Sequence, residues 1–236
     1  MQIALDWCGD GLRAALAAMV SARVSAPRAA GSQLVCNEQG HSAGSVSRGC
    51  VEVAVIEAAG EVMRSGAPAL LKYGLSDERA FAVGLACGGR IRVCVESLDR
   101  SMPQGMAQAL DAAQRESRAV ALFTPLDGST HRLLDAAGLE QLAMTDPVLA
   151  NAGCVSLRTD RAQVVPYMGR DVLVTPRNPP LRLIVIEAVH ISESLCLMAK
   201  AAGYAVTVVD PHAAFLRSER FPGVALGNEP TRQSRT

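Results

Sequence analysis

A proline cluster constrains the fold more than any other feature of this sequence. Three prolines fall within six residues in Thr175-Pro-Arg-Asn-Pro-Pro180. Proline lacks a backbone N–H and fixes φ, so such a run continues neither a helix nor a central strand. The sequence therefore predicts a linker here, with a domain at residues 1–175 before it and a smaller unit at 180–226 after it. The polar segment 227–236 shows no periodicity, which predicts a disordered tail.

The segment after the linker has a β-α-β pattern. Residues 181–186 predict a buried strand, 191–202 a helix, and 204–209 a second strand that ends at Asp210. This is the layout of a dinucleotide-binding unit, but the turn Glu187-Ala-Val-His190 lacks the glycines that let a pyrophosphate approach the backbone. We therefore expect an incomplete Rossmann-like unit with a structural role, and the turn argues against NAD(P) binding.

The first domain predicts alternating helices and strands. Trp7 to Val24 reads as an Ala-rich helix that runs into a short strand, and two or three short elements are expected between Asp127 and Val174. Strands are predicted at residues 33–36, 69–73, 91–96 and 119–123, and helices at 51–64 and 103–117. The fold class is therefore α/β, with an N-terminal mixed α/β domain and an incomplete C-terminal β-α-β unit.

Charge and cysteine content narrow the function classes. Lys plus Arg and Asp plus Glu both number 23, so no nucleic-acid-binding surface is predicted. The sequence shows neither a signal peptide nor an apolar run of about 20 residues, which predicts a cytoplasmic protein without a membrane span. The seven cysteines have no zinc-finger spacing, which predicts reduced thiols.

Two of the cysteines lie in glycine-rich turns. The run Gly44-Ser-Val-Ser-Arg-Gly-Cys-Val-Glu52 places Cys50 at the start of a predicted helix, where free N–H groups and the helix dipole favour a thiolate. Cys87 lies in Gly84-Leu-Ala-Cys-Gly-Gly89. These turns predict a site for sulfur chemistry, a soft metal or an anionic cofactor, and the alternative is that both thiols are buried and structural. Apolar periodic surroundings predict that three further cysteines belong to the core: Cys36, Cys94 and Cys196.

Four sequence blocks, in this order, resemble the XdhC/CoxF family of molybdenum-hydroxylase maturation proteins. They are Ser25-Ala-Pro-Arg28, Gly44–Glu52, Tyr73-Gly-Leu-Ser-Asp77 and Gly84–Gly89. The resemblance covers about residues 5–96 and, in outline, 180–223, whereas residues 97–175 carry no matching motif. The sequence departs from the family pattern at Arg48, which replaces the first of two glycines, and at Glu187-Ala-Val-His190, which replaces a Gly-Ala-Gly-His turn.

This resemblance implies a chaperone rather than an enzyme. Such a protein binds the molybdenum cofactor, as molybdopterin or its dinucleotide form, and inserts the sulfurated cofactor into a hydroxylase such as xanthine or carbon monoxide dehydrogenase. Its implied partners are the hydroxylase large subunit and a cysteine desulfurase. Two alternatives stay open: a cysteine-based sulfur-transfer or redox enzyme acting on the cofactor, and a non-catalytic assembly scaffold. The incomplete second unit leaves sheet edges unpaired, which predicts a homodimer.

The expected cofactor-binding residues come from the glycine-rich turns and the first block. They are Cys50, Cys87, Gly49, Arg48, Ser47, Arg28, Gly88 and Gly89. The two cysteines are also candidate ligands for molybdenum or copper, and no catalytic residue is predicted. The two arginines suit a phosphate group, to which a guanidinium donates several N–H groups. Ser47 either contacts a ligand or caps the turn, and the helix dipole alone accounts for Glu52 at the helix start.

Overall fold

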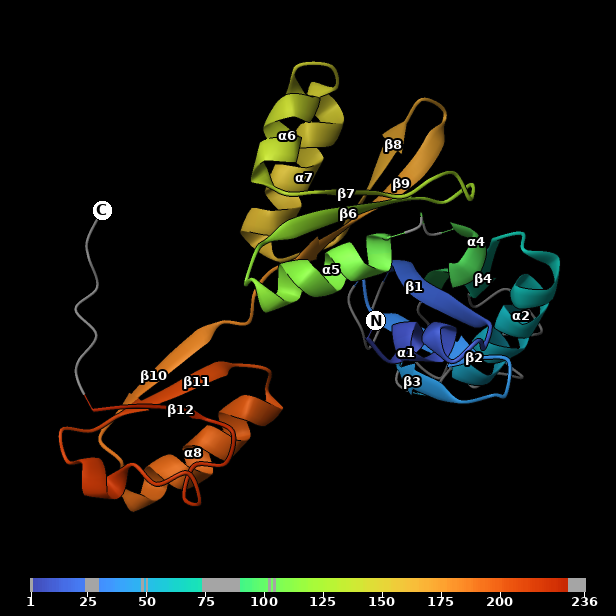
Figure 1. Cartoon of the computed structure of the whole chain (residues 1–236). Helices are drawn as coiled ribbons and strands as arrows, with labels where there is room; N and C mark the ends of the chain where they lie inside the picture. The colour runs from blue at the N-terminus through green and yellow to red at the C-terminus, as the bar shows by residue number, and fades with distance from the viewer. Residues whose placement is uncertain are drawn as a thin grey trace. The chain divides into compact units, whose positions relative to one another are not determined.

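The chain divides into two compact units, Met1–Asn178 and Pro179–Thr236. The computed structural model, shown in Figure 1, describes residues 2–23, 30–47, 49, 51–73, 90–101, 103 and 105–228. Both units combine helices with sheets, which confirms the predicted α/β class. Within these described ranges, no helix is long and apolar enough to cross a membrane.

The first unit contains a five-stranded antiparallel sheet in the order β3-β2-β1-β5-β4. Helix α2 packs on one face, around Val55 and Met19, while α1 and α4 contribute Ala4 and Leu98 to a cluster with Leu16 on the other face. The sheet is therefore buried on both sides. The elements are α1 (Gln2–Gly9), β1 (Ala14–Arg23), β2 (Gln33–Asn37), β3 (Ser42–Gly44), α2 (Glu52–Ser65), β4 (Ala69–Tyr73), β5 (Arg90–Ser97) and α4 (Leu98–Ser101).

The segment from Trp7 to about Val24, predicted as an Ala-rich helix running into a short strand, is mostly strand, because residues 14–23 form the central strand β1 and the helix ends at Gly9. Alanine favours a helix in isolation. Here Ala15 and Ala17 face the α2 side of the sheet, while Ala14 and Leu16 face the opposite cluster. Successive side chains of a strand point to opposite faces, so this alternation buries small side chains on both sides. Burial in the sheet outweighs helix propensity at these positions.

A second antiparallel sheet in the first unit has the order β7-β6-β9-β8. Helices α6 and α7 pack around Phe123 on one face, and α5 packs against Leu122 on the other (Figure 1). The bounds are α5 (Met106–Arg115), β6 (Val120–Pro125), β7 (Arg132–Leu134), α6 (Ala136–Ala143), α7 (Pro147–Thr159), β8 (Gln163–Tyr167) and β9 (Arg170–Arg177). Residues 132–177 thus hold more elements than the two or three that the sequence predicted.

The predicted linker begins too early, because Thr175, Pro176 and Arg177 continue β9 and pair with β6. The partner strand β8 pairs with β9 only as far as Val174. Beyond that point β9 has a neighbour on one side only, so a residue without an N–H is tolerated in the strand. The irregular segment between the units is therefore confined to residues 178–181.

The second unit has a three-stranded parallel sheet, β10-β11-β12, with α8 on one face (Figure 1). This confirms the predicted β-α-β arrangement, and Val185, Cys196 and Phe221 lie in its core. Gly227, expected at the start of the tail, instead ends β12, and residues 229–236 lie outside the described ranges. The elements are β10 (Arg182–Ile186), α8 (His190–Ala201), β11 (Ala205–Val209), η1 (Ala213–Phe215) and β12 (Ala225–Gly227).

Candidate functional site

The structure describes two of the predicted cofactor-binding residues, Ser47 and Gly49. The others lie outside the described residues, so their roles stay predictions: Arg28, Arg48, Cys50, Cys87, Gly88 and Gly89. In the part of the chain that is described, no group of three or more His, Cys, Asp or Glu residues could hold a metal ion. The described part of the candidate site is therefore the loop on either side of position 50.

Glu52, the first residue of α2, organises the loop that precedes the helix. Its Oε1 accepts hydrogen bonds from Ser45 Oγ at 2.7 Å, Ser47 N at 2.8 Å and Val46 N at 3.2 Å. Its Oε2 accepts the Ser47 hydroxyl and the N–H of Gly49 at 2.8 Å. One carboxylate thus accepts hydrogen bonds from several groups of the loop segment 45–49. The expectation that the helix dipole alone accounts for Glu52 is therefore incomplete.

These hydrogen bonds keep the Glu52 carboxylate ionised. Partial burial by itself raises the pKa of Glu52, but hydrogen bonds from Ser47 and Ser45 to the charged form outweigh it and lower the pKa from 4.5 to about 2. The start of α2 therefore carries a fixed negative charge at neutral pH.

This charge changes what the helix start offers to an anion. The N–H groups of Gly49 and Val51, the sequence neighbours of Cys50, both donate to Glu52 Oε2. Those two groups are therefore not free to stabilise the thiolate that the sequence predicts at Cys50, and a nearby carboxylate repels a phosphate group. A bound anion therefore needs positive charge beyond these backbone groups.

Ser47 is fully buried, and its described hydrogen bonds lie within the loop. Its hydroxyl donates to Glu52 and accepts the N–H of Val51 at 3.0 Å. These bonds are of the turn-capping kind. The backbone on both sides of position 50 is thus held by hydrogen bonds to the Ser47 hydroxyl and the Glu52 carboxylate.

Two glycines of the loop are required for different reasons. Gly44 has a φ of +86°, and a Cβ there would lie 2.4 Å from the carbonyl oxygen of Gln33, so close packing requires glycine. Gly49 has a φ of +107°, and no described atom lies within 4 Å of a Cβ placed there, so among the described residues the backbone conformation is what requires glycine. The loop is therefore held tightly against β2 at its beginning.

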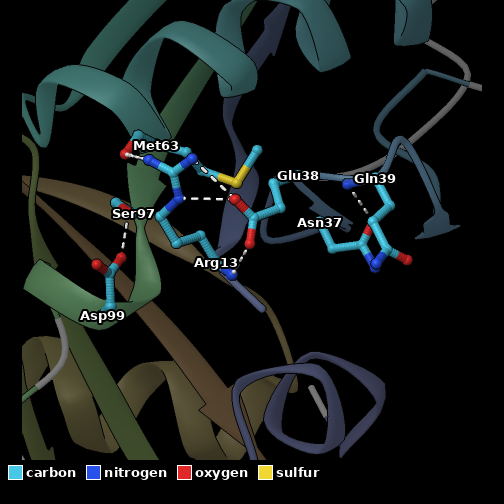
Figure 2. A network of polar contacts seen from close by, with 7 residues as sticks. All are labelled: Arg13, Asn37, Glu38, Gln39, Met63, Ser97 and Asp99. Carbon is cyan, nitrogen blue, oxygen red and sulfur yellow. Dashed lines mark hydrogen bonds and ion pairs between the residues drawn. The ribbon is translucent and has the colours of Figure 1, made fainter. Parts of the chain in front are cut away.

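The far end of α2 is anchored by Arg13, which lies just before β1 (Figure 2). Its Nε donates to Glu38 Oε2 at 2.8 Å, its backbone N–H to Glu38 Oε1 at 3.0 Å, and its Nη1 to the carbonyl oxygen of Met63 at 3.4 Å. Figure 2 shows the Asn37–Gln39 turn beside this network, where Asn37 Oδ1 accepts the N–H of Gln39. The helix that presents the loop is therefore fixed to both β1 and the β2–β3 hairpin.

Sequence reasoning missed a contact between this region and the end of β9. The carbonyl oxygen of Gln33 accepts the N–H of Ser45 at 2.9 Å, and Gln33 Oε1 accepts a hydrogen bond from Arg177 Nη2 at 2.5 Å. Gln33 and Arg177 are 144 positions apart. Neither residue belongs to a motif, and only the fold brings them together.

The described cysteines do not take part in this site. Cys36, Cys94 and Cys196 are buried, which confirms their predicted place in the core. Burial raises the pKa of Cys36 to about 11 and, with help from Glu96, that of Cys94 to about 12. Neither thiol is therefore a thiolate at neutral pH. Cys8 and Cys154 are exposed.

The β10–α8 turn uses its polar groups internally. Asp210 at the end of β11 accepts the N–H of Ala188 at Oδ2 (2.8 Å) and that of His212 at Oδ1 (2.7 Å). In a dinucleotide-binding unit, the corresponding N–H and carboxylate face the pyrophosphate and the ribose. Here they bond to each other, which supports the structural role expected for this unit. Glu187 adopts a φ of +78°, a conformation that usually belongs to glycine.

Comparison with known proteins gives the class to which this fold and loop correspond. Residues 7–74, which include the Glu52 loop, match the model of the XdhC and CoxI family. This match confirms the resemblance carried by the sequence blocks, with CoxI in the family name where CoxF was expected.

Two individual proteins are similar to this chain. The molybdenum cofactor insertion chaperone PaoD of Escherichia coli (strain K12) is 35% identical over 103 residues, which is 44% of this chain and 32% of PaoD. The chain therefore spans about a third of that relative's length. A crystal structure described as a xanthine dehydrogenase from Bacillus halodurans matches with a TM-score of 0.70 at 17% identity, over 96% of this chain and 66% of that one. This second likeness concerns the fold alone.

Proposed function

We propose that this protein is a maturation chaperone that binds the molybdenum cofactor and delivers it to a molybdenum hydroxylase. The observation that carries the proposal is the family match over residues 7–74, because it contains the loop that Glu52 holds in place. The likeness to PaoD, named as a molybdenum cofactor insertion chaperone, points to the same cargo. A backbone fixed on both sides of position 50 is a suitable support for a ligand-contacting side chain.

The finer parts of the proposal concern cargo, partners and place. The cargo is molybdopterin or its dinucleotide form, in the sulfurated state, and Cys50 and Cys87 contact it. The receiving partner is the large subunit of a hydroxylase such as xanthine or carbon monoxide dehydrogenase, and a cysteine desulfurase supplies the sulfur. The exchange takes place in the cytoplasm.

Cofactor retention tests the cargo. The full chain is purified from a molybdenum-replete host, and bound molybdenum and pterin are measured by mass spectrometry and pterin fluorescence. We expect both in equal amounts, and strong loss in Cys50→Ala and Cys87→Ala. The exposed Cys154 on α7 provides a matched control, since Cys154→Ala should retain the cofactor. Wild-type protein without molybdenum or pterin above background would overturn the proposal.

Delivery is tested with an apo-hydroxylase. Cofactor-loaded protein should restore hydroxylase activity faster than the same amount of free cofactor, because the free cofactor is unprotected in solution. Equal rates of activation would contradict a chaperone role and favour a storage role.

We also propose that the protein forms a homodimer. In the described sheets, six edge strands each have a neighbour on one side only: β3, β4, β7, β8, β10 and β12. Such edges are usually covered by another element or another chain. Light scattering at micromolar concentration should give twice the monomer mass, and a stable monomer would refute this part.

A further inference from the structure

Arg177 stands out because its described surroundings provide no negative charge. Its Nη2 donates to the neutral side chain of Gln33 at 2.5 Å, and this is the only hydrogen bond that its guanidinium makes to the described residues. Two other half-buried arginines of this chain have carboxylate partners: Arg92 pairs with Asp171 at 3.2 Å, and Arg220 pairs with Glu193 at 2.7 Å. Within the described part of the chain, no carboxylate lies within ion-pair distance of Arg177.

A desolvated cation without a counter-charge is unfavourable. Arg177 is partly buried, and burial lowers its pKa, yet a guanidinium stays charged at neutral pH. Burying a charge costs free energy unless an opposite charge or several hydrogen bonds compensate. An anionic ligand would supply that compensation.

The position of Arg177 relates it to the Gly44–Glu52 block and to Gly31. Gln33, its partner, also accepts the N–H of Ser45 at the start of the Glu52 loop. Gly31, which comes shortly after Ser25–Arg28 in the sequence, packs against Ala162 and Thr175. A Cβ on Gly31 would lie 2.6 Å from Ala162 Cβ and 3.6 Å from Thr175 Cγ2. Thr175 and Arg177 are two residues apart on β9 and so point to the same face. Arg177 thus reaches the motif-bearing part of the unit from a region that has no motif.

The side chains of Gln33 and Arg177 together form a set of donors. A guanidinium can only donate, so the amide of Gln33 must turn its oxygen toward Arg177 and its NH₂ group away. That NH₂ group adds two donors to the remaining N–H groups of the guanidinium. Phosphate oxygens, which are multiple acceptors with negative charge, are the groups that such donors bind best.

We propose that Arg177 and the Gln33 amide form a binding site for a phosphate group. Resting on the proposed function, this group is the phosphate of the pterin cofactor, as a monoester or as the pyrophosphate of a dinucleotide form. The site supplies a positive charge among the described residues near the Glu52 loop, whose described groups around position 50 carry only the charge of Glu52. It also gives residues 97–177 a function, since β9 carries the cation to the cofactor-binding region.

The first test measures pyrophosphate binding by calorimetry on the full chain. Wild-type protein should bind pyrophosphate, and Arg177→Gln should weaken binding about tenfold or more, because hydrogen bonds to charged groups are worth that much. The control Arg158→Gln removes the same charge from an exposed arginine on α7 and should leave binding within about twofold. Equal pyrophosphate affinity of the wild type and Arg177→Gln would contradict the proposed phosphate site.

The second test separates anion binding from a purely structural role. Gln33→Glu gives Arg177 an internal carboxylate, so the melting temperature should stay the same or rise while pyrophosphate binding falls about tenfold. A structural role alone predicts no loss of binding in this variant, and that result would overturn the proposal. Gln33→Met removes the two amide donors and the hydrogen bond to Arg177 but keeps the cation, so it should lower the melting temperature and weaken pyrophosphate binding, though less than Arg177→Gln does.

The two proposals fail in different ways. If Arg177→Gln retains as much molybdenum and pterin as the wild type, the phosphate site is wrong and the cofactor function stands. If pyrophosphate binding depends on Arg177 but the wild type retains no pterin, the phosphate site stands and the cofactor function is wrong.

Discussion

At the scale of the residue, Glu52 performs the task that an N-cap side chain usually performs. Val51, the N-cap of α2, makes no side-chain capping bond. The carboxylate of the next residue instead accepts the N–H groups of Ser47, Gly49 and Val51. Helix α2 and the loop before it are therefore fixed by one charge, and titrating or removing that charge should loosen both.

The stability of the protein should depend on the ionisation of Glu52. Because its pKa is lowered from 4.5 to about 2, its contribution is fully present above about pH 4.5 and is lost as the pH falls toward 2. Glu52→Gln should lower the free energy of unfolding at pH 7 by about 1–2 kcal/mol, a value reduced for solvent screening. At pH 3 the difference from the wild type should be smaller.

Urea unfolding at a series of pH values from 7 to 3 measures this dependence. Glu57, an exposed carboxylate on the same helix, provides the control, and Glu57→Gln should change stability by less than about 0.5 kcal/mol. A destabilisation by Glu52→Gln that does not change with pH would show that packing, rather than charge, explains the loss.

Glu187 holds a backbone conformation that suits glycine. Its φ of +78° costs an L-residue about 1–2 kcal/mol, which exceeds the entropic cost of glycine of about 0.5–1 kcal/mol. The backbone N–H of Glu187 bonds to Val209 and its carbonyl oxygen accepts the Ser192 hydroxyl, and glycine keeps both bonds. Glu187→Gly should therefore stabilise the second unit by up to about 1 kcal/mol.

Amide hydrogen exchange in β11 measures the stability of that unit. Ser194→Gly, an exposed glycine substitution inside α8, is the control and should destabilise by about 0.5–1 kcal/mol. The expected result is slower exchange in β11 for Glu187→Gly and faster exchange for Ser194→Gly. Faster exchange in Glu187→Gly would mean that the positive φ stores no strain.

At the scale of the element, the hydrophobic periodicity of the sequence predicted several strands and helices at the right places. The helix α2 with its end at Gly66, the strands β2, β4 and β5, and the β10-α8-β11 unit all lie within a few residues of their predicted positions. The alanines of β1 favour a helix in isolation, which is why most of this strand was predicted as a helix. In the fold, β1 pairs with β2 and β5, and hydrophobic clusters cover both of its faces. Single-sequence patterns do not show which segment will be central in a sheet.

A buried contact between two polar side chains joins elements from the two sheets of the first unit. His131, just before β7, places Nε2 2.7 Å from Glu96 Oε2 on β5, and the two side chains are 0% and 3% exposed. His131 is also among the residues that line a cleft of about 500 Å³, together with Met106 and Leu133. Removing one partner of a buried pair leaves the other without compensation.

His131→Leu leaves the buried Glu96 side chain without its hydrogen-bond partner and should destabilise the first unit by about 1–3 kcal/mol. The double variant Glu96→Met with His131→Leu should recover much of this loss, because it removes the uncompensated carboxylate as well. Guanidinium unfolding of both variants measures the two effects. The control is His190→Gln on exposed His190 at the start of α8, which should be nearly neutral. A double variant that is less stable than the single one would contradict the charge argument.

At the scale of the whole molecule, the sequence predicted the motif-bearing loops but not what surrounds them. The Gly44–Glu52 block stands out because its glycines, serines and carboxylate are close together in the chain. The contact between Gln33 and Arg177 leaves no comparable signal, since it depends on how β2 and β9 meet in three dimensions. The same reason explains why residues 97–175 carried no recognisable role in the sequence.

The separate cores of the two units predict separate unfolding. Phe123 lies in the core with Leu139 and Val174, and Phe221 lies in the core with Cys196 and Val208, and both rings are 1% exposed. Replacing a buried phenylalanine by alanine costs about 3–5 kcal/mol in the core that contains it. Phe221→Ala should accelerate amide exchange in β11 and leave β6 and β9 unchanged, whereas Phe123→Ala should do the reverse. The two identical substitutions act as controls for each other, and calorimetry should show that each lowers one of two transitions. If either substitution accelerated exchange equally in both units, the chain would unfold as one cooperative body despite its two cores.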